Sequence, residues 1–237
     1  MKIVIIGNGK MGQSVAKTAK DRGHEIILTI DKDSSNRLSK NNLLAADVAF
    51  EFSQPDSAFQ NINQCFDAGI PVVCGTTGWD EKLPEIQQRC FSEAKALFFA
   101  PNFSIGMNIF MKINEALAEM MEVAEDYNLS INEVHHTQKL DAPSGTAIKL
   151  AQDILELNQK YKTWTKKASD KNDEFPITSE RKGNVTGIHT VKYDSPLDFI
   201  EITHHLKDRR SLAEGAVLAA EFIIGKQGFF NMDSLFA

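Results

Sequence analysis

The sequence is poor in cysteine and has no excess of positive charge. Its 237 residues include three cysteines, Cys65, Cys74 and Cys90, without Cys-x-x-Cys spacing. An odd number without that spacing argues against disulfides and a zinc site, and it favours free thiols in a reducing compartment. The 32 acidic residues outnumber the 26 basic ones and give a net charge of −6, which argues against nucleic acid as a partner.

Long apolar runs are also absent. The first one, Ile3–Ile6, ends directly at Gly7 and is too short for a signal peptide, and no stretch approaches the ~20 residues that a membrane span needs. We therefore expect a cytoplasmic protein with no membrane partner. Hydrophobic residues at 42% and charged residues at 24% are ordinary values for a folded chain, and the length fits one large or two small domains.

The N-terminal residues have the pattern of a strand, a glycine-rich turn and a helix. Ile3–Ile6 is typical of a strand buried on both faces. Gly7, Gly9 and Gly12 follow it, and apolar residues then recur at helical spacing. In a dinucleotide fingerprint the first glycine permits a tight turn, the second lets the backbone approach a pyrophosphate, and the third lets the helix pack against the strand.

A second strand carries the acid that completes this fingerprint. Ile26–Ile30 ends at Asp31, about 20 residues after Gly12, where such an acid accepts a hydrogen bond from a ribose hydroxyl. Lys32 beside it could pair with a 2′-phosphate, so NADH and NADPH both stay open as cofactors. The residues expected at the cofactor here are Gly7, Asn8, Gly9, Lys10, Met11, Gly12, Asp31 and Lys32.

Further alternating strands and helices follow. Val48–Phe52, Ile70–Cys74 and Ala96–Phe99 are predicted strands, with a helix over Pro55–Ala68. Ligands of open α/β sheets bind at the carboxyl ends of the strands, so we expect the loops after the last two strands at the cofactor. Those residues are Gly75, Thr76, Thr77, Ala100, Pro101, Asn102 and Phe103. The alternation predicts an α/β fold with a Rossmann-like parallel sheet that binds a dinucleotide.

From Gly106 the pattern changes to that of a second, α+β domain. A long amphipathic helix is followed by a strand over Leu129–Val134, and Val185–Tyr193 and Phe199–His205 predict a hairpin in an open sheet. Residues 159–182 are rich in Lys, Asp, Ser and Thr and predict an exposed connection, with a lid over the site as the alternative.

Residues 133–147 hold the densest group of reactive side chains. The adjacent imidazoles of His135 and His136, together with Lys139, suit binding of an anion and proton donation near neutral pH. A metal site would call for nearby thiolates or His-Glu-x-x-His spacing, so we expect no metal. His189, His204 and His205 are expected to be structural.

The end of this block predicts the start of a helix that binds an anion. Pro143 disfavours helix at the residue before it, and Ser144 is placed to cap the helix that follows. The backbone N–H groups of Gly145 and Thr146, with nearby hydroxyls, would then form a cradle that fits a carboxylate.

The block resembles the signature of the 4-hydroxy-tetrahydrodipicolinate reductase (dihydrodipicolinate reductase) family, Glu-x-His-His-x-x-Lys-x-Asp-x-Pro-Ser-Gly-Thr-Ala, which matches residues 133–147. The resemblance also covers residues 7–12, 75–78, 100–106, 187–190, 201–204 and 209–216. Asp208 and Leu212 depart from the family's pattern on either side of an arginine that the chain retains, and Ser53-Gln54 departs from it at a cofactor turn.

The resemblance implies hydride transfer from NADH or NADPH to a cyclic dicarboxylic imine, giving tetrahydrodipicolinate in the diaminopimelate route to lysine. It implies that His135 and Lys139 are the proton-donating pair, and that His136, Ser144, Gly145 and Thr146 bind the substrate together with Lys139. Hydride transfer requires the glycine turn and the imidazole block to meet in one cleft.

The resemblance further implies a homotetramer formed through the sheets, and a final helix that returns to the first domain. We therefore expect a dinucleotide-binding domain over 1–105 and 210–237, and a substrate-binding and oligomerisation domain over 106–209. Two alternatives stay open: another NAD(P)-dependent amino-acid dehydrogenase, and a non-catalytic dinucleotide sensor. The first does not account for Pro143–Thr146 beside paired histidines, and the second would need a partner-binding module, of which no basic recognition helix gives a sign.

Overall fold

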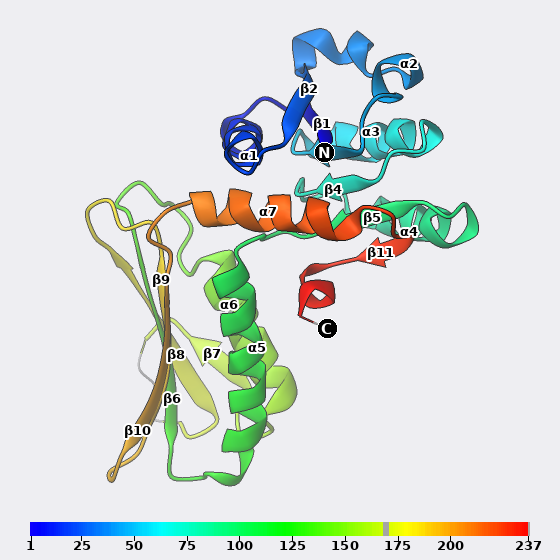
Figure 1. The fold of residues 1–237 in the computed structure, drawn as a ribbon. Coiled ribbons are helices and arrows are strands. Elements are labelled where there is room, and N and C mark those ends of the chain that lie inside the picture. Colours follow the sequence, from blue (N-terminus) through cyan, green and yellow to red (C-terminus); the bar gives the residue numbers. More distant parts are fainter. Residues whose placement is uncertain (168–170, 237) are drawn as a thin grey trace. The chain divides into compact units, whose positions relative to one another are not determined.

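The computed structural model describes residues 1–167 and 171–236, and the chain divides into two compact units (Figure 1). Unit 1 comprises Met1–Ile105 and Arg210–Ala237, and unit 2 comprises Gly106–Arg209.

Unit 1 is built on a six-stranded sheet with the order β11-β5-β4-β3-β1-β2, in which neighbouring strands are parallel. The strands are β1 (Lys2–Ile6), β2 (Glu25–Ile30), β3 (Val48–Glu51), β4 (Val72–Cys74), β5 (Ala96–Phe99) and β11 (Gly228–Phe230). Since β1 lies between β2 and β3, the strand order reverses at the β1/β3 pair, which is where sheets of this class open a crevice for a ligand.

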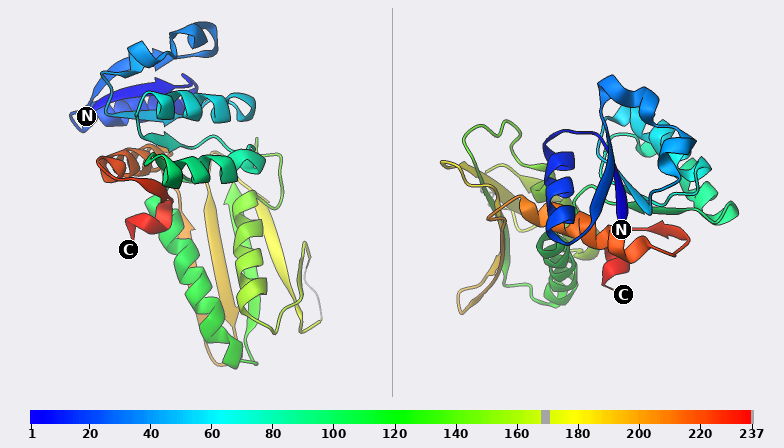
Figure 2. Two further views of the ribbon diagram at one scale, coloured as in Figure 1. Left: turned by 90° about the vertical axis from the view of Figure 1, so that its right-hand side faces the viewer. Right: turned by 45° about the horizontal axis from the view of Figure 1, so that its top comes forward.

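Helices cover both faces of this sheet (Figures 1 and 2). Ile3 and Ile5 pack with α1 and α7 on one face, whereas Val4 and Ile6 pack with α3 and α4 on the other. This alternation explains why β1 is a continuous apolar run. The helices of the unit are α1 (Lys10–Asp21), α2 (Lys40–Leu43), α3 (Pro55–Asp67), α4 (Leu83–Ser92) and α7 (Arg210–Ile223), with short 3₁₀ turns η1 (Lys32–Arg37), η2 (Asp80–Lys82) and η4 (Met232–Leu235).

Unit 2 is built on a five-stranded mixed sheet with the order β10-β9-β6-β8-β7. The strands are β6 (Asn128–His135), β7 (Thr163–Thr165), β8 (Glu174–Arg181), β9 (Ile188–Asp194) and β10 (Phe199–His205). Two helices, α5 (Ile105–Met120) and α6 (Gly145–Leu157), lie on one face of it, and η3 (Met121–Val123) follows α5 (Figures 1 and 2). Leu129 and Ile131 of β6 pack there against Leu150 and Ile154 of α6.

The predicted fold class is confirmed: a Rossmann-like parallel sheet is joined to a second unit with a mixed sheet. The hairpin of β9 and β10 is confirmed as well. The prediction of an exposed connection over 159–182 is wrong at β7 and β8, which lie within it, and Phe175 and Ile177 of β8 are core residues. The many polar residues conceal this strand's alternation, and residues 168–170 lie outside the described part of the chain.

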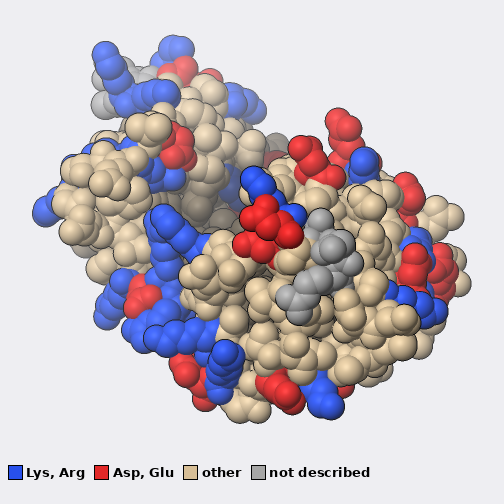
Figure 3. All heavy atoms as spheres, turned by 90° about the horizontal axis from the view of Figure 1, so that it is seen from above, with Lys and Arg blue, Asp and Glu red and all other residues tan. Residues whose placement is uncertain are grey.

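The cysteines are free, as the sequence predicted, and all three are buried. Burial raises the pKa of the Cys65 thiol to about 12 and that of Cys90 to about 11, so neither is a nucleophile at neutral pH. None of the helices in the described residues is long and apolar enough to cross a membrane. Lysine and arginine side chains occur together with acidic ones on the face shown in Figure 3.

Candidate functional site

The glycine turn after β1 has the geometry that its spacing predicted. Gly7 adopts a φ of +99°, and a Cβ on it would lie 2.2 Å from the carbonyl oxygen of Phe52. A Cβ on Gly12 would lie 1.9 Å from the carbonyl oxygen of Gly7, so α1 packs against the turn too closely for any side chain. By contrast, a Cβ on Gly9 would have no atom within 4 Å. The fold requires two of the glycines, and the third borders open space.

That open space lies at the N-terminus of α1. Gly9 is the N-cap residue and supplies no side chain to the first N–H groups of the helix, which begins at Lys10. Unsatisfied N–H groups and the helix dipole favour an anion at such a position. The side-chain amide of Gln13 donates a hydrogen bond to the carbonyl oxygen of Asn8 (2.9 Å), which ties the turn to the first turn of α1.

The acid expected at the ribose is exposed at the end of β2. The Asp31 carboxylate accepts a hydrogen bond from the backbone N–H of Lys32 (2.7 Å), and the side chains of both residues are open to solvent. The carboxylate is therefore anchored on one oxygen and accessible to a hydroxyl donor.

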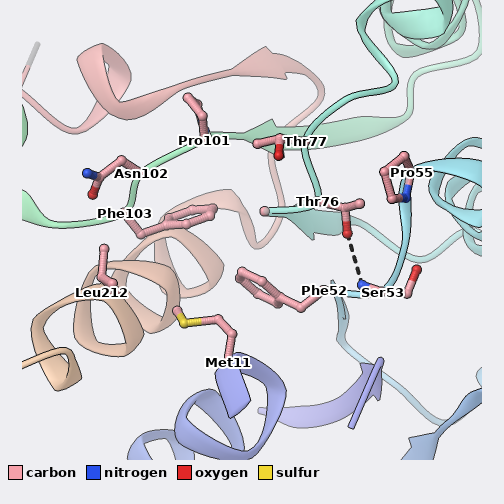
Figure 4. A pocket seen from close by; sticks show the side chains of 11 residues that line it. Met11, Phe52, Ser53, Pro55, Thr76, Thr77, Pro101, Asn102, Phe103 and Leu212 are labelled. Carbon is pink, nitrogen blue, oxygen red and sulfur yellow. Dashed lines mark hydrogen bonds between the residues drawn. The ribbon is translucent and has the colours of Figure 1, made fainter. Parts of the chain in front are cut away.

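A cavity of about 330 Å³ lies at the carboxyl ends of β3, β4 and β5 (Figure 4). The rings of Phe52 and Phe103, with centroids 5.8 Å apart, and the Met11 side chain point toward one another there. The cavity is lined by Met11, Phe52, Ser53, Pro55, Gly75, Thr76, Thr77, Pro101, Asn102, Phe103 and Leu212. Its volume lies within the range of small-molecule pockets, and its walls combine aromatic surface with a few hydroxyl and amide groups.

Most of the loop residues expected at the cofactor line this cavity. Ala100 does not line it, because its side chain is buried in the core behind the loop. The sequence did not indicate Phe52 or Pro55 at this cavity, although both lie at the end of a predicted strand or just after it. It marks Ser53 and Leu212 only as departures from the family pattern.

In unit 2 a buried cluster surrounds the last turn of β6. Glu133 and His135 lie two residues apart on the same face of the strand, and β9 pairs with β6 so that His189 lies opposite Glu133. The Glu133 carboxylate oxygen Oε2 is 3.3 Å from His135 Nδ1 and 3.8 Å from His189 Nε2. The two imidazole rings meet edge to face, with centroids 5.1 Å apart. Sequence spacing gives no sign that His189 lies here.

The other oxygen of Glu133 ties the cluster to the loop that follows it. It accepts hydrogen bonds from the backbone N–H of Ser144 (3.0 Å) and from the Arg181 guanidinium (3.3 Å). Arg181, at the end of β8, also donates to the carbonyl oxygens of Lys139 (3.2 Å) and Asp141 (2.5 Å). Arg181 therefore holds the lysine loop against β6, a contact that the sequence did not reveal.

The environment shifts the pKa values of this cluster. Burial, with the charges of Lys139 and Arg181, lowers the pKa of His135, although Glu133 opposes the shift. Burial and the neighbouring His135 lower the pKa of His189 to about 4, which makes this imidazole neutral at physiological pH. Burial would raise the pKa of Glu133, but hydrogen bonds from Ser144 and Ser179 reverse the shift, so the group is a carboxylate.

The predicted helix start is present at α6. The Ser144 hydroxyl accepts a hydrogen bond from the backbone N–H of Ala147 (3.2 Å) and contacts His189 Nε2 (3.2 Å). Gly145 is exposed, with no atom within 4 Å of an added Cβ, and Thr146 is half-buried. The first residue of α6 thus borders free space, next to the serine that contacts the imidazole cluster.

Two more residues of the block lie on the loop between β6 and α6. The Lys139 ammonium pairs with the Asp141 carboxylate at 2.8 Å, and the Lys139 N–H donates to the carbonyl oxygen of His136 (3.1 Å). The His136 side chain is half-buried. Since the Asp141 partner is exposed, an incoming anion competes with it for Lys139 at little cost.

The spacing of three groups in this cluster would also suit a metal ion. One ligating atom each of Glu133, His135 and His189 lies within 4.8 Å of the others. The Arg181 guanidinium already pairs with the same carboxylate, and Lys139 lowers the pKa of His135, so two cations compete with a metal for this position. The absence of a metal stays a prediction.

Comparison with known proteins places these features in one family. The N-terminal family model of dihydrodipicolinate reductase matches residues 1–103, and the C-terminal one matches residues 106–236. A 4-hydroxy-tetrahydrodipicolinate reductase of Christiangramia forsetii is 48% identical over 232 residues, which cover 98% of this chain and 96% of that protein. The enzyme of the same name from Staphylococcus carnosus is 33% identical over 99% of both chains.

A solved structure has the same architecture. The dipicolinate-bound dihydrodipicolinate reductase of Paenisporosarcina sp. TG-14 superposes with a TM-score of 0.81 at 25% identity, covering 98% of this chain and 97% of that one. A probable dehydrogenase of Thermotoga maritima, with a TM-score of 0.58 and 9% identity, shares the fold only.

Proposed function

The chain belongs to the dihydrodipicolinate reductase family, and from this premise we propose that it is a 4-hydroxy-tetrahydrodipicolinate reductase. The enzyme reduces a cyclic dicarboxylic imine with NADH or NADPH, with loss of water from the 4-hydroxy form, and gives tetrahydrodipicolinate in the diaminopimelate route to lysine. One observation carries the proposal: buried imidazoles lie beside a helix N-terminus whose first residue, Gly145, borders free space.

In this proposal the nucleotide binds to unit 1. The N–H groups at the start of α1 hold the pyrophosphate beside Gly9, and Asp31 accepts from the ribose. Because β2 and β3 lie on opposite sides of β1, a nucleotide with its ribose at the end of β2 would have its nicotinamide held on the other side, in the cavity lined by Phe52, Thr76 and Phe103. The bound nicotinamide supplies the hydride.

The dicarboxylate binds to unit 2. Its carboxylates accept hydrogen bonds from the N–H groups of Gly145 and Thr146 and from the Ser144 hydroxyl, and they pair with Lys139 and His136. A helix N-terminus and a cation are the groups that favour such an anion. Binding here displaces Asp141 from Lys139 and removes that ion pair.

His135 and Lys139 form the proton-donating pair. When hydride reaches the imine carbon, the ring nitrogen gains electron density and takes a proton from this pair. The pKa of His135 is lowered in the free protein by burial and by two cations. A bound dianion opposes those cations, so substrate binding raises that pKa and protonates the donor when it is needed. Glu133, His189 and Arg181 position His135 and the lysine loop.

We further propose that the protein is a cytoplasmic homotetramer. Three buried free thiols support a reducing compartment. The sheet face of unit 2 that α5 and α6 leave uncovered supports association, because Phe199 on the edge strand β10 points to the face opposite to Ile202, which packs on the core, and is 59% exposed. Light scattering coupled to size exclusion tests the tetramer, and a monomeric mass at working concentration refutes it.

The activity is tested by following NADH and NADPH oxidation while the freshly formed product of the preceding synthase is supplied. Turnover with at least one nucleotide is expected, and no turnover with either refutes the reductase. Paired binding titrations with NADH and NADPH then decide the preference that Asp31 and Lys32 leave open.

A further inference from the structure

A fully buried carboxylate lies behind the cavity of unit 1. Glu51 is the last residue of β3, and its side chain is 0% exposed. None of the lysines, arginines or histidines in the described residues forms an ion pair with it. An ionised group without a counter-ion is costly to bury, so other groups must stabilise the Glu51 side chain.

The partners of Glu51 are uncharged donors. Asn61 Nδ2 donates to Oε1 (3.1 Å), the Ser53 hydroxyl bonds to the same oxygen, and the Thr76 hydroxyl bonds to Oε2. The Cys74 thiol lies 3.6 Å from Oε2. Since the Thr76 hydroxyl oxygen already accepts the Ser53 N–H (2.9 Å), its own proton is available for the carboxylate. Both carboxylate oxygens therefore accept hydrogen bonds, which is the pattern of the ionised form.

Two of these donors also line the cavity. Ser53 follows β3 and Thr76 follows β4, and Figure 4 shows both residues at the cavity wall with the hydrogen bond that the Ser53 backbone N–H donates to the Thr76 hydroxyl. Glu51 thus joins the ends of two strands and places a negative charge one hydrogen bond behind the surface where we have placed the nicotinamide. This step rests on the proposed function.

We propose that Glu51 is a positioning residue whose charge favours the oxidised nucleotide over the reduced one. The nicotinamide ring is neutral in NADH and becomes a cationic pyridinium when a hydride, with its two electrons, leaves C4 for the imine carbon. A fixed negative charge in a buried environment stabilises that developing positive charge more than it would in water. The hydroxyls of Ser53 and Thr76 hold their orientation because both are bound to the same carboxylate.

The test compares the dissociation constants of the oxidised and reduced nucleotides, using whichever of the NAD and NADP pairs the wild type binds more tightly. Glu51→Gln keeps the size of the side chain and removes its charge. We expect the ratio Kd(oxidised)/Kd(reduced) to rise about tenfold, as for the loss of one nearby charge. Glu51→Asp retains the charge and serves as the matched control, with a ratio within about twofold of wild type. A structural role alone would weaken both nucleotides equally, and an unchanged ratio in folded Glu51→Gln overturns the proposal.

A second measurement covers the case in which Glu51→Gln does not fold. Wild-type protein is titrated with NAD⁺ and with its uncharged isostere, in which a benzamide ring replaces the nicotinamide. We expect NAD⁺, with its cationic ring, to bind about tenfold more tightly than the uncharged isostere. Equal or weaker binding of NAD⁺ overturns the proposal. If the wild type binds neither nucleotide pair, the proposed function itself fails; if it binds them with no preference for charge, only the role of Glu51 fails.

Discussion

The glycine turn of unit 1 and the imidazole cluster of unit 2 build their candidate sites from different groups. At the turn the groups proposed to face the ligand belong to the backbone, and side chains are excluded at two positions: a Cβ at Gly7 or Gly12 would collide with a carbonyl oxygen. At the cluster the reactive groups are side chains, held by a buried carboxylate, a second imidazole and Arg181.

The difference has a physical origin. A pyrophosphate already carries its charge, so N–H groups of fixed geometry suffice to hold it. A proton donor has to change its charge near neutral pH, and only titratable side chains in a tuned environment do so. We therefore expect substitutions in the cluster to alter the rate and its pH dependence, and substitutions in the turn to alter binding and stability.

The largest effect is expected in the cluster. His135→Gln and Lys139→Ala should each lower kcat by ~10²-fold or more, the usual contribution of a lost proton donor. Steady-state kinetics at saturating nucleotide measures this. The comparison requires the NADH or NADPH dissociation constant to stay at the wild-type value in both variants, and near-wild-type rates in both refute the assigned roles.

The turn should respond through stability. Gly12→Ala places a methyl group 1.9 Å from the Gly7 carbonyl oxygen, and we expect it to lower the free energy of unfolding by about 2–3 kcal/mol in urea titrations. Gly9→Ala is the matched control: with no atom within 4 Å it should leave stability within about 0.5 kcal/mol. It should still weaken nucleotide binding about tenfold, because the methyl group occupies the space proposed for the pyrophosphate. Equal stability losses in both variants would contradict this account.

His189 should make stability depend on pH. Its pKa is about 4 in the folded chain and near 6.5 when unfolded, so the unfolded state binds the proton first and stability falls as the pH drops below 6.5. Between pH 7.5 and pH 5 His189 should lower the free energy of unfolding by about 2 kcal/mol. His189→Gln should remove that part of the loss, measured from urea midpoints at each pH, whereas His205→Gln at an exposed position should not. Parallel pH curves for wild type and His189→Gln would refute the assignment.

The smallest effect concerns Arg181. The charge of Arg181 contributes to the lowered pKa of His135. A general acid works only in its protonated form, so kcat/KM should fall as the pH rises through the pKa of His135, which lies below the ordinary pKa of a histidine. Arg181→Gln should move this descending limb to higher pH. Because the lysine loop also loses its anchor, kcat/KM below the limb should drop about tenfold. An unmoved limb would mean that the guanidinium acts on loop geometry alone.

The sequence predicted the parts of this protein that depend on local spacing. The three glycines, the acid about 20 residues later and the alternating strands predicted the parallel sheet and the position of its nucleotide turn. Ser144 predicted the start of α6, since a capping residue acts within one helical turn. The cluster of His135, His136 and Lys139 indicated proton donation and anion binding, and the resemblance to a family singled out His135 and Lys139 as the expected proton-donating pair.

The remaining features depend on pairing between distant strands. His189 lies opposite Glu133 because β9 pairs antiparallel with β6, and Arg181 reaches the lysine loop because β8 pairs parallel with β6. The polar composition of residues 159–182 concealed β8, whose two core residues become evident only when β6 pairs with it. Glu51 is an ordinary acid in the sequence, and the fold alone surrounds it with four donors behind the cavity. Spacing along the chain determines helices, turns and strands because these form between near neighbours, whereas the charges that tune a site come from residues that only the sheet register brings together.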